Sequence, residues 1–207
     1  VKNKIVFTSD FFKEDIVGGA EINDGTVVEH FKKEGFLFKK VHSHDLTPAF
    51  ILENLDKHYF ISNFVNLPTV SKALLYDKCS YVLYEHDYKF LKCRNPIYFP
   101  DFKAPKYQLT NMNFYKGARK VICLSEMHMD IFSLNTGLEN LTNTHCSMFS
   151  DELLDYLVSL SDTPKTKPFA VIKSNNPTKR MDYALKFCEQ NNLPYELISS
   201  DDNREFL

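Results

Sequence analysis

Short apolar runs alternate with amphipathic segments along most of the chain. Strands are predicted by runs rich in β-branched and aromatic residues, at 5–9, 36–42, 59–62, 81–84, 120–125, 142–148, 169–172 and 195–198. Helices are predicted between them, at 19–34, 47–55, 68–77, 107–118, 126–134, 150–157 and 180–190. This alternation predicts an α/β fold, in which a Rossmann-like parallel sheet is covered by helices on both faces.

A polar stretch with two prolines divides the pattern near its end. This stretch, residues 161–168, has the composition of a linker. The 207 residues fit one full domain plus a piece of another. We therefore expect an N-terminal domain over 1–160, a linker over 161–168, and a single βαβ unit over 169–207 that opens a second domain.

Composition narrows the class of protein. The chain is 43% hydrophobic and 25% charged, which excludes disorder, collagen and coiled coil. Its 25 basic and 27 acidic residues give a net charge of −2, so we expect no nucleic-acid partner. No apolar run approaches the ~20 residues of a membrane span, and no secretory leader precedes the first strand. Together with five scattered cysteines, this predicts a cytoplasmic protein with reduced thiols.

In parallel α/β sheets, ligands bind at the carboxyl ends of the strands. Gly18, Gly19 and Glu21 follow the first predicted strand and open the first helix. Two glycines allow close approach of the backbone, and a helix N-terminus attracts phosphate. The alternative is a tight turn and a helix start that bind nothing.

Two further groups follow later strands. His86 and Asp87 come after the fourth strand, where a histidine can act in acid–base catalysis or bind a sugar hydroxyl. Lys173 and Lys179 flank a polar turn before a helix, which suits a diphosphate clamp. The alternatives are a surface loop that contains histidine and a solvated basic turn.

These motifs, taken in order, resemble one family. A Gly-Gly-x-Glu loop at 18–21, a strand ending in His86-Asp87, a strand over 121–125 leading into a helix at Glu126, and a Lys-rich turn over 173–179 occur in sequence. The chain resembles the retaining GT-B glycosyltransferases of the group-1, GT4-like type. The resemblance implies a GT-B N-terminal domain followed by the start of a donor-binding domain.

The resemblance also implies roles. The donor would be a nucleotide-diphosphate sugar, bound by Gly18, Gly19, Glu21, Lys173 and Lys179. His86 and Asp87 would be the catalytic residues, with His86 next to the donor sugar. The two lysines would neutralise the diphosphate leaving group, so neither a metal nor another cofactor is expected. A metal set of Cys79, His86 and Cys93 matches no common zinc spacing.

The acceptor stays open: a glycan, a lipid-linked sugar or a small molecule. The aromatic and Lys-rich segment 31–40 suggests peripheral membrane contact, or simply solvated lysines at a helix end. Arg180 stands where the family usually has Gly, and Lys173 where it more often has Arg. The Glu-rich motif of the donor domain is missing after residue 169. The alternatives are therefore a truncated enzyme fragment, a non-catalytic binding or assembly module that forms a homodimer, and a nucleotide-sugar epimerase of the same fold.

Overall fold

The computed structural model describes residues 4–164, 169–175 and 179–198. The chain forms two compact units, unit 1 over 1–148 and unit 2 over 149–207. We expected the division within residues 161–168. Four residues of that predicted linker, the middle of the predicted Lys-rich turn and the last nine residues lie outside the described part.

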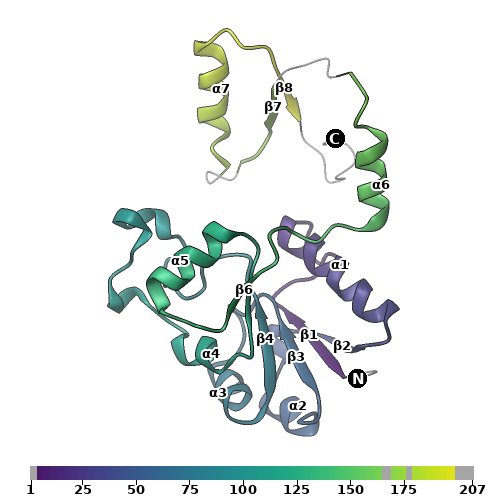
Figure 1. Ribbon diagram of the computed structural model, residues 1–207, viewed down its shortest axis with the longest axis vertical. Helices are drawn as coiled ribbons and strands as arrows, with labels where there is room; N and C mark the ends of the chain where they lie inside the picture. Colours follow the sequence, from purple (N-terminus) through teal and green to yellow (C-terminus); the bar gives the residue numbers. More distant parts are fainter. Residues whose placement is uncertain (1–3, 165–168, 176–178, 199–207) are drawn as a thin grey trace. The chain divides into compact units, whose positions relative to one another are not determined.

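Unit 1 is built on a six-stranded sheet. Its strands are β1 (Ile5–Ser9), β2 (Leu37–His42), β3 (His58–Ile61), β4 (Ser80–Tyr84), β5 (Val121–Cys123) and β6 (Leu141–Asn143). They lie in the order β2-β1-β3-β4-β5-β6, and every neighbouring pair is parallel (Figure 1). The predicted α/β class and its Rossmann-like parallel sheet are confirmed.

Helices connect these strands in the predicted places. They are α1 (Gly19–Lys33), α2 (Pro48–Glu53), α3 (Thr69–Lys78), α4 (Met112–Gly117) and α5 (Glu126–Thr136). Thr47 caps α2 by accepting from the Phe50 amide, with Pro48 in the first turn. Ser125 caps α5 by accepting from the His128 amide. Side-chain oxygens at these positions satisfy amides that have no partner inside the helix.

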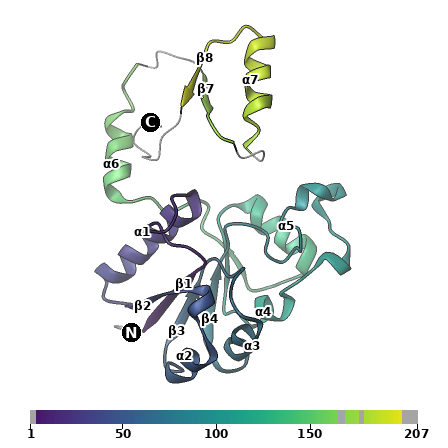
Figure 2. The ribbon, with the colours of Figure 1, turned by 180° about the vertical axis from the view of Figure 1, so that it is seen from behind.

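The two faces of the sheet carry two separate apolar cores. The smaller core packs Val27 and Val28 of α1 against Phe7 and Tyr84 of the sheet. The larger core contains side chains of α2, α3, α4 and α5, such as Ile51, Leu75, Phe114 and Phe132. Helices therefore cover both faces, as predicted, with α1 on one side and α2–α5 on the other (Figure 2). This arrangement follows from the strand order. The connection from β1 to β2 runs one way along the sheet and the connections from β2 to β6 run the other way, and right-handed crossovers in opposite directions place their helices on opposite faces.

Several predicted elements are shorter than expected, and for two of them the structure shows why. The helix predicted over 107–118 begins only at Met112, because Asn111 has a φ of 55° that no helix interior accepts. Three short 3₁₀ turns precede it, Pro96–Tyr98, Pro100–Phe102 and Lys106–Gln108. The strand predicted over 142–148 ends at Asn143, whose side chain accepts from the His145 amide and turns the chain.

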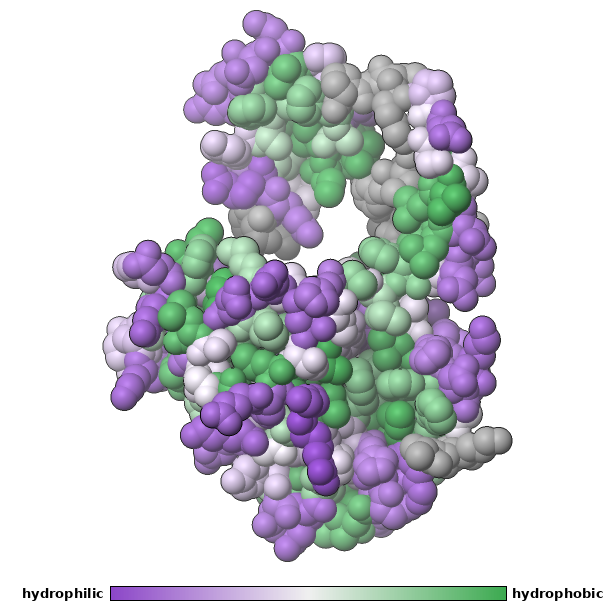
Figure 3. Space-filling model, viewed as in Figure 1, coloured by the Kyte–Doolittle hydropathy of each residue, from purple (hydrophilic) through white to green (hydrophobic). Residues whose placement is uncertain are grey.

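Unit 2 contains one βαβ motif and the helix before it. Its elements are α6 (Asp151–Ser159), β7 (Phe169–Ile172), α7 (Met181–Gln190) and β8 (Tyr195–Ile198), with β7 and β8 parallel. Ser150 caps α6 by accepting from the Leu153 amide. Hydrophobic surface lies over α6 and over the small sheet (Figure 3). The large apolar side chains of unit 2 that are more than a third exposed include Leu154, Val158, Phe169, Ile172, Tyr183, Phe187 and Leu197, of which Tyr183 and Phe187 belong to α7.

Candidate functional site

The carboxyl ends of β1, β3 and β4 gather polar side chains around one residue of α1. The chain leaves β1 toward α1 on one face of the sheet and leaves β3 toward α3 on the other, so these strands flank the topological switch point. Ser9 ends β1, Ser62 follows β3, and His86 lies just beyond β4. All three side chains reach Asp24, which we group with them as the Asp24 cluster.

Asp24 is fully buried and its carboxylate is saturated with hydrogen bonds. Ser9 Oγ donates to Asp24 Oδ2 over 3.0 Å, and Ser62 Oγ donates to Oδ1 over 2.8 Å. His86 Nε2 lies 2.8 Å from Asp24 Oδ1. A carboxylate enclosed without water needs such donors, because an unpaired buried charge is strongly unfavourable. The cluster is therefore a rigid support for the His86 ring.

The second ring nitrogen of His86 is left unused. When Nε2 carries the proton that Asp24 accepts, Nδ1 presents its lone pair, and it has no hydrogen-bond partner in the described part of the chain. The ring also packs edge-on against Tyr84, with centroids 4.9 Å apart, and Tyr84 Oη donates to Asn23 Oδ1. The His86 side chain is 9% exposed, so a small part of it remains accessible to a ligand.

Asp24 was not among the residues picked out from the sequence, although a signal was present. Ala20, Val27, Val28 and Phe31 mark the apolar side of α1 at helical spacing. Asp24 lies on that same side, four residues after Ala20 and four before Val28. A carboxylate on a stripe that faces a sheet predicts a buried polar partner, and the structure supplies it as His86.

Asp87 does not join His86. Its carboxylate lies 2.8 Å from Lys89 Nζ and 2.5 Å from a guanidinium nitrogen of Arg94. The reason is the alternation of side chains along an extended chain, which sends neighbouring residues to opposite faces of the sheet. His86 points to the α1 face, whereas Glu85 and Asp87 point to the other. The two residues expected to be catalytic therefore lie in separate networks, and the carboxylate that contacts His86 is Asp24.

Glu85, Asp87 and Lys89, with Tyr115 and Arg94 around them, form a second network, the Glu85 cluster. Lys89 Nζ lies 3.1 Å from Glu85 Oε2, and Tyr115 Oη donates to Glu85 Oε1 over 2.9 Å. Burial raises the pKa of Glu85, although the charge of Lys89 opposes this shift. Burial also disfavours charge on Lys89, but the carboxylates of Glu85 and Asp87 outweigh it and raise the pKa of Lys89.

The start of α1 brings Gly18, Gly19 and Glu21 together. Gly18 caps the helix without a side-chain hydrogen bond. A Cβ on Gly18 would lie 2.5 Å from Glu21 Oε2, so the Glu21 carboxylate folds back over the first turn. Gly19, in contrast, has open space around it. Because the helix N-terminus attracts negative charge, Glu21 occupies the place that a phosphate would take, and it must move aside for one.

Lys173 and Lys179 lie in unit 2, at the carboxyl end of β7 and just before α7. Both are exposed, and no described carboxylate pairs with them. Arg180, where the resembled family has Gly, adopts a φ of 51°. This left-handed conformation favours glycine, so the unusual residue sits where a Cβ is costly. Its guanidinium lies over the Tyr183 ring, 5.1 Å from the centroid.

No activated nucleophile or metal centre is seen in the described ranges. Burial raises the pKa of Cys123 to about 12 and also raises that of Cys79, which keeps both thiols protonated. Within the described residues no three His, Cys, Asp or Glu side chains gather as metal ligands. None of the described helices has the length and apolarity to cross a bilayer. The residues predicted from the sequence can therefore act in two ways. His86 of unit 1 can form a hydrogen bond, and Lys173 and Lys179 of unit 2 carry positive charge.

Comparison with known proteins adds no relative: no family model, no curated protein and no solved structure matches the chain. The function of the protein is therefore inferred from its fold and from the geometry of the Asp24 cluster.

Proposed function

We propose that the protein is a glycosyltransferase of the GT-B, group-1 type, which transfers a sugar from a nucleotide-diphosphate sugar to a glycan, lipid-linked or small-molecule acceptor. The observation that carries the proposal is His86, oriented by the buried Asp24 at the carboxyl edge of the sheet. Asp24 belongs to the same helix whose N-terminus holds Gly18 and Gly19. This is where a parallel α/β sheet binds its ligands.

The proposed chemistry assigns each group a separate task. Asp24 fixes the ring of His86, and His86 Nδ1 hydrogen-bonds a hydroxyl of the donor sugar. Lys173 and Lys179 stabilise the negative charge that grows on the departing diphosphate, in place of a metal ion. Asp87 takes no part, because Lys89 and Arg94 already hold its carboxylate. The anomeric configuration is retained, in keeping with the family that the motifs resemble.

Isothermal titration with a panel of nucleotide sugars, including UDP-glucose and GDP-mannose, tests the role of His86. At least one nucleotide sugar should bind to the unchanged protein. The His86→Ala variant should bind that donor about tenfold more weakly or worse, because the substitution removes a hydrogen bond in an enclosed site. His30→Ala is the matched control, because His30 is exposed at the far end of α1. Equal binding by His86→Ala and the unchanged protein would show that His86 does not contact the donor.

A second titration tests the lysine clamp. The double variant Lys173→Ala/Lys179→Ala should bind the same donor about tenfold more weakly, because two cations facing the diphosphate are lost. Lys186→Ala removes an exposed lysine of α7 and should change nothing. If the double variant binds as tightly as Lys186→Ala, the diphosphate is held elsewhere.

One observation favours a second candidate, a non-catalytic assembly module. Unit 2 leaves large apolar side chains exposed, with Tyr183 at 61% and Phe187 at 50% of their full accessible surface. Such a surface is typical of a protein interface. Light scattering at increasing concentration should then show a dimer that Phe187→Ser abolishes. A dimer together with no heat from any nucleotide sugar would favour this candidate over the transferase.

A further inference from the structure

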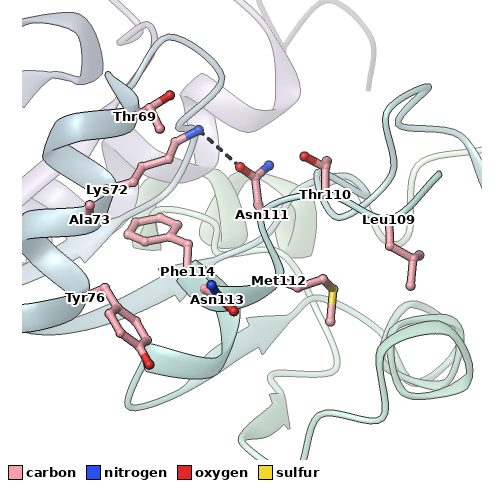
Figure 4. Close-up of a pocket in the computed structure, with 10 residues that line it drawn as sticks. All are labelled: Thr69, Lys72, Ala73, Tyr76, Leu109, Thr110, Asn111, Met112, Asn113 and Phe114. Carbon is pink, nitrogen blue, oxygen red and sulfur yellow. Dashed lines mark hydrogen bonds between the residues drawn. The ribbon is translucent and has the colours of Figure 1, made fainter. Parts of the chain in front are cut away.

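A pocket opens between α3 and α4 on the face of unit 1 opposite to α1. It has a volume of about 530 Å³. Residues of its lining, drawn in Figure 4, include Thr69, Lys72, Tyr76, Leu109, Asn111 and Met112. We refer to it as the α3–α4 pocket. Its size lies in the range of small-molecule sites, and no member of the Asp24 cluster lines it.

Lys72 is the only cation in the lining, and it lacks a countercharge. Its Nζ donates to the neutral Asn111 Oδ1 over 3.3 Å, and it lies 5.1 Å from the centroid of the Phe64 ring. No carboxylate lies within ion-pairing distance of Lys72 in the described part of the chain. The carboxylate that acts on the charge of Lys72 is Asp10, and Asp10 already accepts hydrogen bonds from Ser43 Oγ and from two backbone amides.

This environment is unfavourable for an ammonium group. Lys72 is half-buried, and burial lowers its pKa against the weaker opposing effect of Asp10. An ammonium has three donors, and the described contacts use one of them. A cation held at the wall of a cavity with unused donors is suited to an anion from outside the chain.

The Asn111 side chain is fixed by a hydrogen bond to a distant segment. The φ of Asn111, 55°, lies in the left-handed region, which asparagine tolerates better than most non-glycine residues. Asn111 Nδ2 donates to the Lys89 carbonyl over 2.9 Å. The side chain is thereby oriented with Oδ1 toward Lys72, as Figure 4 shows. The pocket's polar edge is therefore pre-organised.

The rest of the pocket combines polar and apolar walls. α3 begins at Thr69 without a side-chain cap, so its first turn adds partial positive charge beside Lys72. On the apolar side lie Tyr76, which is 53% exposed, and Leu109 and Met112. The exposed Tyr76 ring and the Met112 thioether each present polarisable surface to an apolar or planar group. The two kinds of wall together fit one anionic group joined to an apolar body.

We infer that the α3–α4 pocket binds a small molecule in which a phosphate or carboxylate is joined to an apolar or aromatic body. The anion contacts Lys72 and the first turn of α3, and the body packs on Tyr76 and Met112. This inference does not rest on the proposed transferase activity, because it uses other residues on the other face of the sheet.

Three probes test it by amide NMR titration of the full chain: phenyl phosphate, benzoate and the uncharged benzyl alcohol. At least one anionic probe should shift the amide signals of Tyr76 and Asn111, and benzyl alcohol should bind about tenfold more weakly or not at all. Whichever anion binds more tightly identifies the charged group that the pocket prefers.

Variants locate the binding. Lys72→Met keeps the apolar stem, removes the charge and should weaken the anionic probe about tenfold or more. Lys78→Met makes the same change at an exposed position of the same helix and should bind as the unchanged protein does. Tyr76→Ala serves as a second variant and should also weaken binding.

The inference is overturned if neither anion binds, if benzyl alcohol binds as tightly as the anions, or if Lys72→Met retains full affinity. Circular dichroism of each variant confirms that it is folded before titration.

Discussion

Two buried polar networks lie side by side at the end of β4, and they differ in what they leave unsatisfied. In the Glu85 cluster, Lys89 lies between the carboxylates of Glu85 and Asp87, and Tyr115 donates a hydrogen bond to the other carboxylate oxygen of Glu85. In the Asp24 cluster, every donor points inward to one carboxylate, but His86 keeps a free ring nitrogen. The first network is closed on itself, whereas the second presents one group outward.

The difference shows that adjacent residues can belong to separate chemistries. Glu85, His86 and Asp87 are consecutive, yet chain alternation sends the outer two to the α2–α5 face and the middle one to α1. A closed network stabilises the fold, and an open one is available to a ligand. Variants of each network should therefore differ in whether they change stability or binding.

Lys89→Met should have the largest effect on stability. It leaves the fully buried Glu85 carboxylate without a cation, whereas Asp87 keeps its ion pair with Arg94, and an unpaired buried charge costs about 3–5 kcal/mol in the free energy of unfolding. Urea denaturation at pH 7 measures this loss, with the exposed Lys78→Met as a control that should unfold as the unchanged protein does.

The loss should become smaller as the pH falls. Glu85 already has a raised pKa through burial, and without Lys89 it rises further, so acid neutralises the unpaired group. A deficit that stays constant from pH 7 to pH 5 would contradict the assignment of Lys89 as the countercharge.

Asp24→Ala should be the next most damaging change, at about 2–4 kcal/mol. It leaves the donors of Ser9, Ser62 and His86 without an acceptor inside a closed space. Thermal unfolding measures the loss, and nucleotide-sugar titration should show that binding falls with it. A stable Asp24→Ala protein that binds its donor normally would remove Asp24 from the proposed site.

Arg94→Gln should have a small effect, about 0.5 kcal/mol or less. Arg94 reaches Asp87 from a side chain that is half exposed, and ion pairs at such positions are screened by water and salt. Denaturation at low and high salt provides the measurement. A loss as large as that of Lys89→Met would mean that the Glu85 cluster depends on its outer cation.

Replacing His128 should have the smallest effect on stability, which is visible only in the pH dependence of the free energy of unfolding. Burial lowers its pKa, although its hydrogen bond to the Asp87 carbonyl opposes this. Its unfolded form takes up a proton near pH 6.5, before the folded form does, so the unchanged protein loses stability as the pH falls below that value. His128→Phe should show a shallower decline between pH 7 and pH 5. Parallel profiles would exclude His128 as a contributor.

Much of the fold was predictable because local patterns dominate it. Alternating apolar runs located the strands of the sheet, and the helices that follow Thr47 and Ser150 begin where the sequence predicts them. Ser125 was expected as the end of a strand, and the structure shows that its side chain also caps α5. The prediction was wrong at residues 107–111, where Asn111 adopts a left-handed conformation. Asparagine tolerates that conformation but does not require it, and the Asn111 side chain is hydrogen-bonded to the Lys89 carbonyl, 22 residues earlier in the chain.

The candidate site was predictable only in part. His86 was expected from its place after a strand, but Asp24 enters through a contact across 62 residues of sequence. The α3–α4 pocket depends in the same way on Lys72 meeting Asn111, 39 residues apart. Periodicity indicates which side of a helix is buried, but it does not say which strand the helix will face.

By itself, the sequence determined the parallel α/β architecture, the positions of most helices and strands, and the strand ends at which polar residues collect. These follow from hydrophobic periodicity and capping, which act over a few residues. Only the tertiary structure decided that His86 pairs with Asp24, that Asp87 pairs with Lys89, and that Lys72 lines a pocket without a countercharge. Those outcomes depend on the face of the sheet on which each side chain lies. That face is determined by packing between segments that are distant in the sequence.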